Sequence, residues 1–161
     1  MKRNRFPSAS TTGTTELWSG GKLGNLACVF NGKNLIEVKP KGVPSGPAGD
    51  SVTSFAEGPD LTVYLGTEKG AIYRVVDRVA ERLNVTYPIN AGRVTSLMFE
   101  GGRDLLAVFA EAGLYRVNVA SAAIAEVPWN EIKAHRHLCC LVRDAAGHVW
   151  LGTNKGLFKF K

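Results

Sequence analysis

A repeat constrains the fold of this chain more than any other feature. Three similar segments follow one another, each with an apolar run, a glycine and a second run of alternating residues. Their glycines, Gly70, Gly113 and Gly156, are spaced 43 residues apart. A fixed period of this length is typical of architectures that stack one small unit repeatedly. The sequence therefore predicts a repeat protein.

Each copy has the pattern of a β-hairpin, in which an apolar run meets a turn and an alternating run follows. The copies span residues 61–75, 105–117 and 149–160. A degenerate copy spans residues 26–38, with Asn34 in the place of the glycine and 36 residues before Gly70. Asparagine tolerates the left-handed backbone better than most residues, so we expect Asn34 to adopt it.

Further strands are predicted around each hairpin. One precedes it, at residues 15–18, 51–55, 94–98 and 138–142, and a fourth follows it at residues 83–87 and 123–127. Four short strands in about 43 residues are the period of a β-propeller blade. An α+β fold is the alternative, because residues 77–83 and 120–135 contain helix formers, although Pro88 and Pro128 interrupt them. We expect an all-β propeller array of about four four-stranded blades.

One copy matches a known repeat. Asp144, Gly147, Trp150 and the run Gly152-Thr153 with Gly156-Leu157 fit D-x-x-G-x-x-W-x-G-T-x-x-G-L. This pattern resembles the two-component-regulator propeller repeat family, and streptogramin-lyase-like propellers carry similar repeats. The resemblance implies the architecture and, in that family, an extracytoplasmic sensing domain of a longer chain. It implies no particular activity.

The predicted organisation is a basic segment at residues 1–14, then blades at about 15–50, 51–92, 93–136 and 137–161. The last copy stops after its third strand, and residues 5–10 are the best candidate for a closing strand. Three arrangements remain open: a closed four-bladed ring, two copies that complete an eight-bladed ring, and part of a larger propeller.

Charge and cysteines limit the partners and the compartment. The net charge is +6, and Lys2, Arg3 and Arg5 carry half of it. The other basic residues are scattered, which argues against nucleic-acid binding. Three cysteines, two of them adjacent, make a poor disulfide framework and suggest free thiols. With no signal-peptide pattern and no apolar run of membrane-spanning length, we expect a cytoplasmic location, or an extracytoplasmic one if a signal peptide was removed.

Candidate chemistry is sparse. In an extended strand His135, His137 and Cys139 would share one face and approach a zinc ion, but three ligands on one strand give poor tetrahedral geometry. We therefore predict no metal and no cofactor. The Gly66–Gly70 and Gly152–Gly156 segments place lysine before the second glycine and precede a strand, so they are predicted turns rather than phosphate loops.

Enzyme activity is left open, with a non-enzymatic role favoured. No G-x-S-x-G elbow occurs. The catalytic alternative is a propeller lyase in which His135 or His137 acts as base with Glu100 as acid.

The favoured function is recognition or sensing, because loops at the ends of a propeller channel form a concave mouth. The expected ligand is a small molecule, glycan or protein, and a homodimer that completes a ring is a further expected partner. By repeat position the lining is predicted to be Trp18, Phe55, Glu57, Arg93, Glu100, His137 and Asp144. For Trp18, packing in the core is the competing interpretation.

Overall fold

The computed structural model describes residues 9–11, 16–20, 27–41, 50–128 and 137–160. Every helix or strand element in these ranges is a β-strand, which confirms the predicted all-β class. The helix formers at residues 77–82 lie in a turn and a strand instead. None of the described residues forms a helix long and apolar enough to cross a membrane.

The N-terminal half forms one eight-stranded sheet with the order β1-β2-β3-β4-β8-β7-β6-β5. Its strands are β1 (Ala9–Thr11), β2 (Leu17–Gly20), β3 (Ala27–Phe30), β4 (Leu35–Pro40), β5 (Val52–Glu57), β6 (Val63–Thr67), β7 (Ile72–Val76) and β8 (Val79–Arg82). Neighbouring strands are antiparallel except β4 and β8, which pair in parallel through two residues each. We call β1–β4 the first unit and β5–β8 the second.

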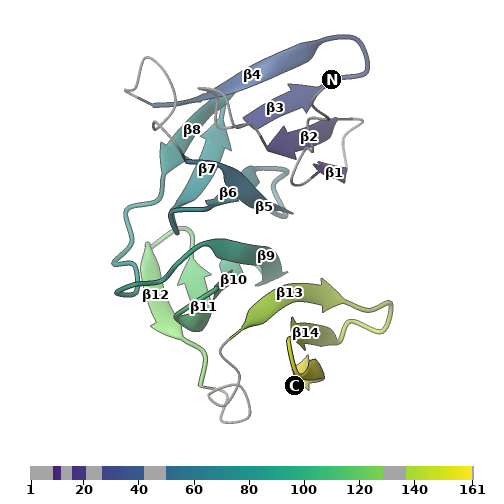
Figure 1. Cartoon of the computed structure of the whole chain (residues 1–161). Coiled ribbons are helices and arrows are strands. Elements are labelled where there is room, and N and C mark those ends of the chain that lie inside the picture. The colour runs from purple at the N-terminus through teal and green to yellow at the C-terminus, as the bar shows by residue number, and fades with distance from the viewer. Residues whose placement is uncertain (1–8, 12–15, 21–26, 42–49, 129–136, 161) are drawn as a thin grey trace, which may run out of the picture.

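Two smaller sheets follow, as Figure 1 shows from teal to yellow. The third unit contains β9 (Val94–Gly101), β10 (Asp104–Phe109), β11 (Gly113–Asn118) and β12 (Ala123–Glu126). The fourth contains β13 (Leu138–Arg143), β14 (Val149–Thr153) and β15 (Gly156–Phe160). Within both sheets each strand pairs antiparallel with the next one along the chain. The number of blades in a complete ring stays a prediction.

The 43-residue glycine spacing has a backbone cause. Gly70, Gly113 and Gly156 have φ angles of 78°, 111° and 133°, in the region that residues with a Cβ rarely adopt. In the first unit the expectation for Asn34 is wrong, because Gly32 adopts this conformation, with φ of 88°. The Asn31 side chain supports that turn instead, since its Oδ1 accepts the Asn34 N–H at 2.8 Å.

The fourth strand of the second unit is four residues earlier than the sequence suggested. The prediction placed it at residues 83–87, whereas β8 spans Val79–Arg82. The connecting residues Asp77 and Arg78 both have positive φ, 49° and 64°, which is the geometry of a two-residue hairpin turn whose twist matches the strands. Arginine is not a typical residue for such a turn, so the pattern gave no signal. In the third unit the prediction is confirmed, because β12 spans Ala123–Glu126.

Apolar clusters lie between successive units. Because strand side chains alternate in direction, each unit presents two faces. We call the face that packs on the following unit the forward face and the opposite one the rear face. In the second unit Tyr64 and Ile72 lie forward, in a cluster with Phe109 of the third unit. Leu65 and Tyr73, one residue further along, lie in the rear cluster with the first unit. A third cluster joins the third and fourth units.

The N-terminal residues take part in the first unit. Of the candidate closing strand at residues 5–10, the structure describes Ala9 and Ser10, which belong to β1 and pair with β2 at Ser19 and Trp18. They therefore extend the first unit, and β15 lies at the edge of the last sheet. Residues 5–8 lie outside the described part of the chain.

Candidate binding site

A repeated hydrogen bond positions the residue that precedes the inner strand of three units. In each case a backbone N–H in the turn after the second strand donates to the carbonyl of that residue. The bonds are Glu68 N to Ser51 O at 2.8 Å, Ala110 N to Arg93 O at 2.9 Å, and Asn154 N to His137 O at 3.1 Å. Arg93 and His137 therefore occupy equivalent positions in adjacent units.

Threonine hydroxyls connect the inner strands β5, β9 and β13. Thr53 Oγ1 lies 2.6 Å from the carbonyl oxygen of Val94 in β9. Thr95 Oγ1 lies 3.2 Å from the carbonyl oxygen of Leu138 in β13. These side chains donate across the gap between one unit and the next, so the starts of the three inner strands lie close together.

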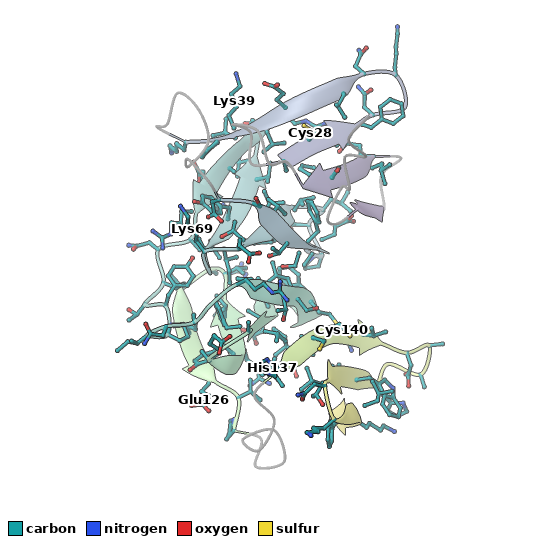
Figure 2. The ribbon with its side chains drawn as sticks, in the orientation of Figure 1. Cys28, Lys39, Lys69, Glu126, His137 and Cys140 are labelled. Carbon is teal, nitrogen blue, oxygen red and sulfur yellow. The ribbon has the colours of Figure 1, made fainter. Side chains whose placement is uncertain are left out.

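A pocket of about 370 Å³ lies at this end of the inner strands. Its lining is Thr53, Glu68, Arg93, Thr95, Ala110, His137, Leu138 and Cys139. Figure 2 labels His137 at the start of β13. The structure brings together Arg93 and His137, two residues that the sequence predicted as binding residues from different repeats.

The pocket carries polar groups that are available to a ligand. Glu68, Arg93 and His137 are all exposed, and no described residue pairs with their side chains. An arginine guanidinium binds carboxylate or phosphate oxygens through two parallel N–H donors. Imidazole adds a donor or acceptor, and a carboxylate accepts hydroxyl protons. This set fits a ligand with one anionic group and neighbouring hydroxyls.

Other predicted lining residues lie at the opposite ends of the inner strands. Glu57 ends β5, and Glu100 lies next to the end of β9. The Glu100 carboxylate forms an ion pair with Arg116 at 2.8 Å. The backbone carbonyl of Glu100 accepts a hydrogen bond from the Arg143 side chain at 2.9 Å.

This placement separates the two members of the lyase alternative. Arg143 ends β13, whereas His137 precedes that strand, and six residues of strand span about 20 Å. The structure therefore does not bring His137 and Glu100 together. His135, the other candidate base, lies outside the described residues.

Asp144 is bound within its own turn. Its carboxylate accepts hydrogen bonds from Trp150 Nε1 at 2.9 Å and from the backbone N–H of His148 at 2.8 Å, and the His148 ring lies at 3.0 Å. The Trp150 bond, followed by those of His148, holds the pKa of Asp144 well below its usual range. Gly147, with φ of 86°, closes the turn. These contacts explain why aspartate, glycine and tryptophan occur three residues apart in the motif.

Trp18 belongs to the core, as its competing interpretation held. It is 3% exposed, and Phe55 packs against the same cluster. The Trp18 Nε1 atom has no hydrogen-bond partner among the described residues. A second cavity of about 230 Å³ adjoins it, where Arg78 pairs with Glu16 and its guanidinium lies 5.8 Å from the indole ring.

Besides Leu138, the sequence did not predict five residues of the main pocket as binding residues: Thr53, Glu68, Thr95, Ala110 and Cys139. The repeat itself holds a signal for them. Thr53, Thr95 and Cys139 each follow the first residue of an inner strand, and Glu68 and Ala110 each follow the last residue of a second strand. Comparing equivalent positions across repeats would have placed all five beside Arg93 and His137.

Metal binding and thiol reactivity depend on the histidines, cysteines and carboxylates of the described residues. No group of three or more His, Cys, Asp or Glu side chains comes together there in a way that could hold a metal ion. Cys28 is half-buried, Cys139 and Cys140 are exposed, and all three are free. Burial, followed by the charge of Glu37, raises the pKa of the Cys28 thiol, which lowers its reactivity.

Comparison with known proteins gives similarity in structure only. No protein-family model matches the chain, and no curated protein matches it. A solved structure with TM-score 0.73 and 19% identity is the extracellular domain of BT4673 from B. thetaiotaomicron, named in one structure as a one component system and in another as a hybrid two component system. The match includes 96% of this chain and 21% of the BT4673 domain.

Two further similar structures are a bacterial lyase and a designed protein. Virginiamycin B lyase from Staphylococcus aureus has TM-score 0.70 and 14% identity over 95% of this chain and 54% of its own. The computationally designed Ika4 protein has TM-score 0.68 and 12% identity over 99% of this chain and 92% of its own.

The chain spans about a fifth of the length of the extracellular domains that it matches. At these identities the likeness concerns the fold and not the activity. The two groups of proteins that the repeat motif resembles, two-component-system propellers and streptogramin B lyase, both occur among these structures. The chain has the β-propeller fold.

Proposed function

We propose that this propeller module is a non-enzymatic recognition domain that binds a small ligand carrying a carboxylate or phosphate group beside hydroxyls. One observation carries the proposal: Arg93 and His137, from equivalent positions of adjacent units, line one pocket of about 370 Å³. That volume lies within the range of small-molecule sites, roughly 300–1,000 Å³. Acidic monosaccharides have this chemistry and are small enough to fit in this volume.

The location of the module is part of the proposal. Three of the similar structures are extracellular domains of signalling proteins. This favours the extracytoplasmic alternative over the cytoplasmic location expected from the sequence. A sensing role outside the cytoplasm also fits a pocket that opens at the loop end of the sheets.

The test is an amide NMR titration of the full chain with glucuronate, galacturonate, glucose 1-phosphate and neutral glucose. We expect at least one charged sugar to shift the signals of residues that line the pocket, and glucose to shift them much less. Arg93→Ala should weaken that binding by about tenfold or more, because the bidentate contact with the anion is lost.

Arg103→Ala is the matched control, since Arg103 is also exposed but lies in the turn between β9 and β10. It should leave binding unchanged. The proposal fails if none of the charged sugars shifts pocket signals, or if the two arginine variants weaken binding equally.

A further inference from the structure

No described residue packs over Leu157 on the forward face of the fourth unit, although that face matches positions that the second and third units bury. Val108 and Gly152 pair with Leu114 and Leu157, just as Gly66 pairs with Ile72. Ile72 is 0% exposed, Leu114 is 2% exposed and Leu157 is 64% exposed. The first two are covered by the next unit, whereas no described residue covers Leu157.

The inner strand β13 shows the same difference. Thr53 and Thr95 each reach a backbone carbonyl of the next unit, at 2.6 Å and 3.2 Å. Cys139 holds the equivalent position in β13 and is exposed, and its thiol lies 3.7 Å from the carbonyl oxygen of His137 in its own unit. Cys140, which Figure 2 labels on β13, is exposed as well.

Gly152 leaves a notch that a neighbouring strand would fill. Its counterpart Gly66 lets Val94 of the third unit approach so closely that an added Cβ would lie 2.5 Å from Val94 Cγ1. The three atoms nearest to a Cβ added at Gly152 all belong to Cys140 of the same unit: Sγ at 2.7 Å, the backbone oxygen at 3.8 Å and the backbone nitrogen at 4.0 Å. The fourth unit thus has a glycine that would allow a neighbouring strand to come close, but no described residue of another unit is near it.

The rear face of the first unit likewise presents apolar side chains that no other described unit covers. Leu17, Phe30 and Leu35 pair across β2, β3 and β4 and form one row, with exposures of 42%, 39% and 66%. Leu17 matches Val94, because Leu17 pairs with the last residue of β3 and Val94 pairs with the last residue of β10. Leu17 thus places an apolar side chain at the position from which Val94 approaches Gly66.

We propose that the forward face of the fourth unit binds the rear face of the first unit in a second copy of this chain. Two such contacts close a ring of two chains, with Leu17 of each chain in the Gly152 notch of the other. The contact continues the stacking that already joins successive units within the chain. Pairing through complementary surfaces that close is the rule for stable homo-oligomers.

The first test is solution mass by light scattering during size exclusion, over a range of concentrations. We expect a mass of two chains for the wild type. Leu157→Asp and Phe30→Asp should each weaken association at least about tenfold, because each buries an unpaired charge at the contact. Ile89→Asp is the matched control, since Ile89 is also exposed at 91% but belongs to neither face, and it should leave the mass unchanged.

Mixing the two variants tests the head-to-tail geometry. Each retains the face that the other has lost, so the mixture should regain one contact and form a pair that is weaker than the wild type. A wild-type monomer at all concentrations would overturn the proposal, as would open-ended growth. Self-association of Phe30→Asp at the wild-type strength would also overturn it, because it would show two forward faces in contact.

A cross-link tests the register without relying on a charged variant that could fail to fold. In Leu17→Cys, mild oxidation should join position 17 of one chain to Cys140 of another, identified by peptide mass spectrometry. The same oxidation of Ile89→Cys should give no such link to Cys140. Absence of the 17–140 link in a chain that folds would contradict the proposed register.

Discussion

The second and fourth units share one hairpin pattern but differ in what lies on their forward faces. Gly66 and Gly152 both precede Thr in a G-T-x-K-G turn, and Ile72 and Leu157 both face forward. The second unit is enclosed by its neighbours, whereas the fourth has a neighbour on its rear face alone among the described residues. The same residue pattern therefore stabilises the protein in one place and presents an apolar surface in the other.

The largest effect expected from this difference concerns Ile72 and Leu157. Ile72→Ala should lower the free energy of unfolding by about 2–5 kcal/mol, because it leaves a cavity in a closed cluster. Leu157→Ala should change it by no more than about 0.5 kcal/mol, because that side chain is already in water. Urea unfolding at low protein concentration measures both, below any self-association. Equal losses would mean that the fourth unit is covered in the monomer.

A smaller difference is expected at the paired glycines. Gly66→Ala should destabilise by about 1–3 kcal/mol, since its Cβ would lie 2.3 Å from Ser54 Oγ and 2.5 Å from Val94 Cγ1 in a packed interface. Gly152→Ala should cost much less, because the exposed Cys140 thiol can rotate away from the 2.7 Å contact.

Thermal unfolding of the two glycine variants gives the measurement. Gly152→Ala in a Cys140→Ala background is the control that removes the remaining contact. A loss at Gly152 as large as that at Gly66 would contradict the view that its forward side is open.

The smallest expected difference in stability is between the turn that follows β13, with Asp144, and the turn that follows β5, with Asp60. Asp144→Asn should lower the melting temperature at pH 7, because an amide nitrogen cannot accept the Trp150 and His148 hydrogen bonds. Asp60→Asn should change little, since the amide oxygen can still accept the Thr62 N–H, 3.1 Å from Oδ1 in the wild type.

The pH dependence of Asp144 follows from its lowered pKa. A carboxyl whose pKa is lower in the folded state contributes stability above the unfolded pKa of about 3.9 and loses it as the pH falls toward the folded value. The difference between wild type and Asp144→Asn should therefore be full near neutral pH and shrink below about pH 4. A difference that persists in acid would assign the effect to shape rather than charge.

Most of the strand pattern could be predicted because it depends on local residues. Glycines at 43-residue intervals mark positive-φ turns, and alternating side chains mark the hairpins. The two turns that were predicted wrongly also have local causes. The turn at Asp77 and Arg78 uses residues that rarely adopt positive φ, and in the first unit Gly32, not Asn34, has the positive φ. The site was predicted only in part, because the predicted lining included residues from both ends of the inner strands, and the stacking of the units decides which end holds the pocket.

The sequence by itself determined the all-β class, the repeat and the turns, since these depend on backbone sterics and side-chain alternation within about 43 residues. Only the tertiary structure decided which residues at equivalent repeat positions are buried, exposed or part of the pocket. Stacking of one unit on the next joins Arg93 and His137 in a pocket, separates Glu100 from them, buries Ile72 and leaves Leu157 exposed. Burial depends on what lies across the interface, and that neighbour belongs to another unit of the chain.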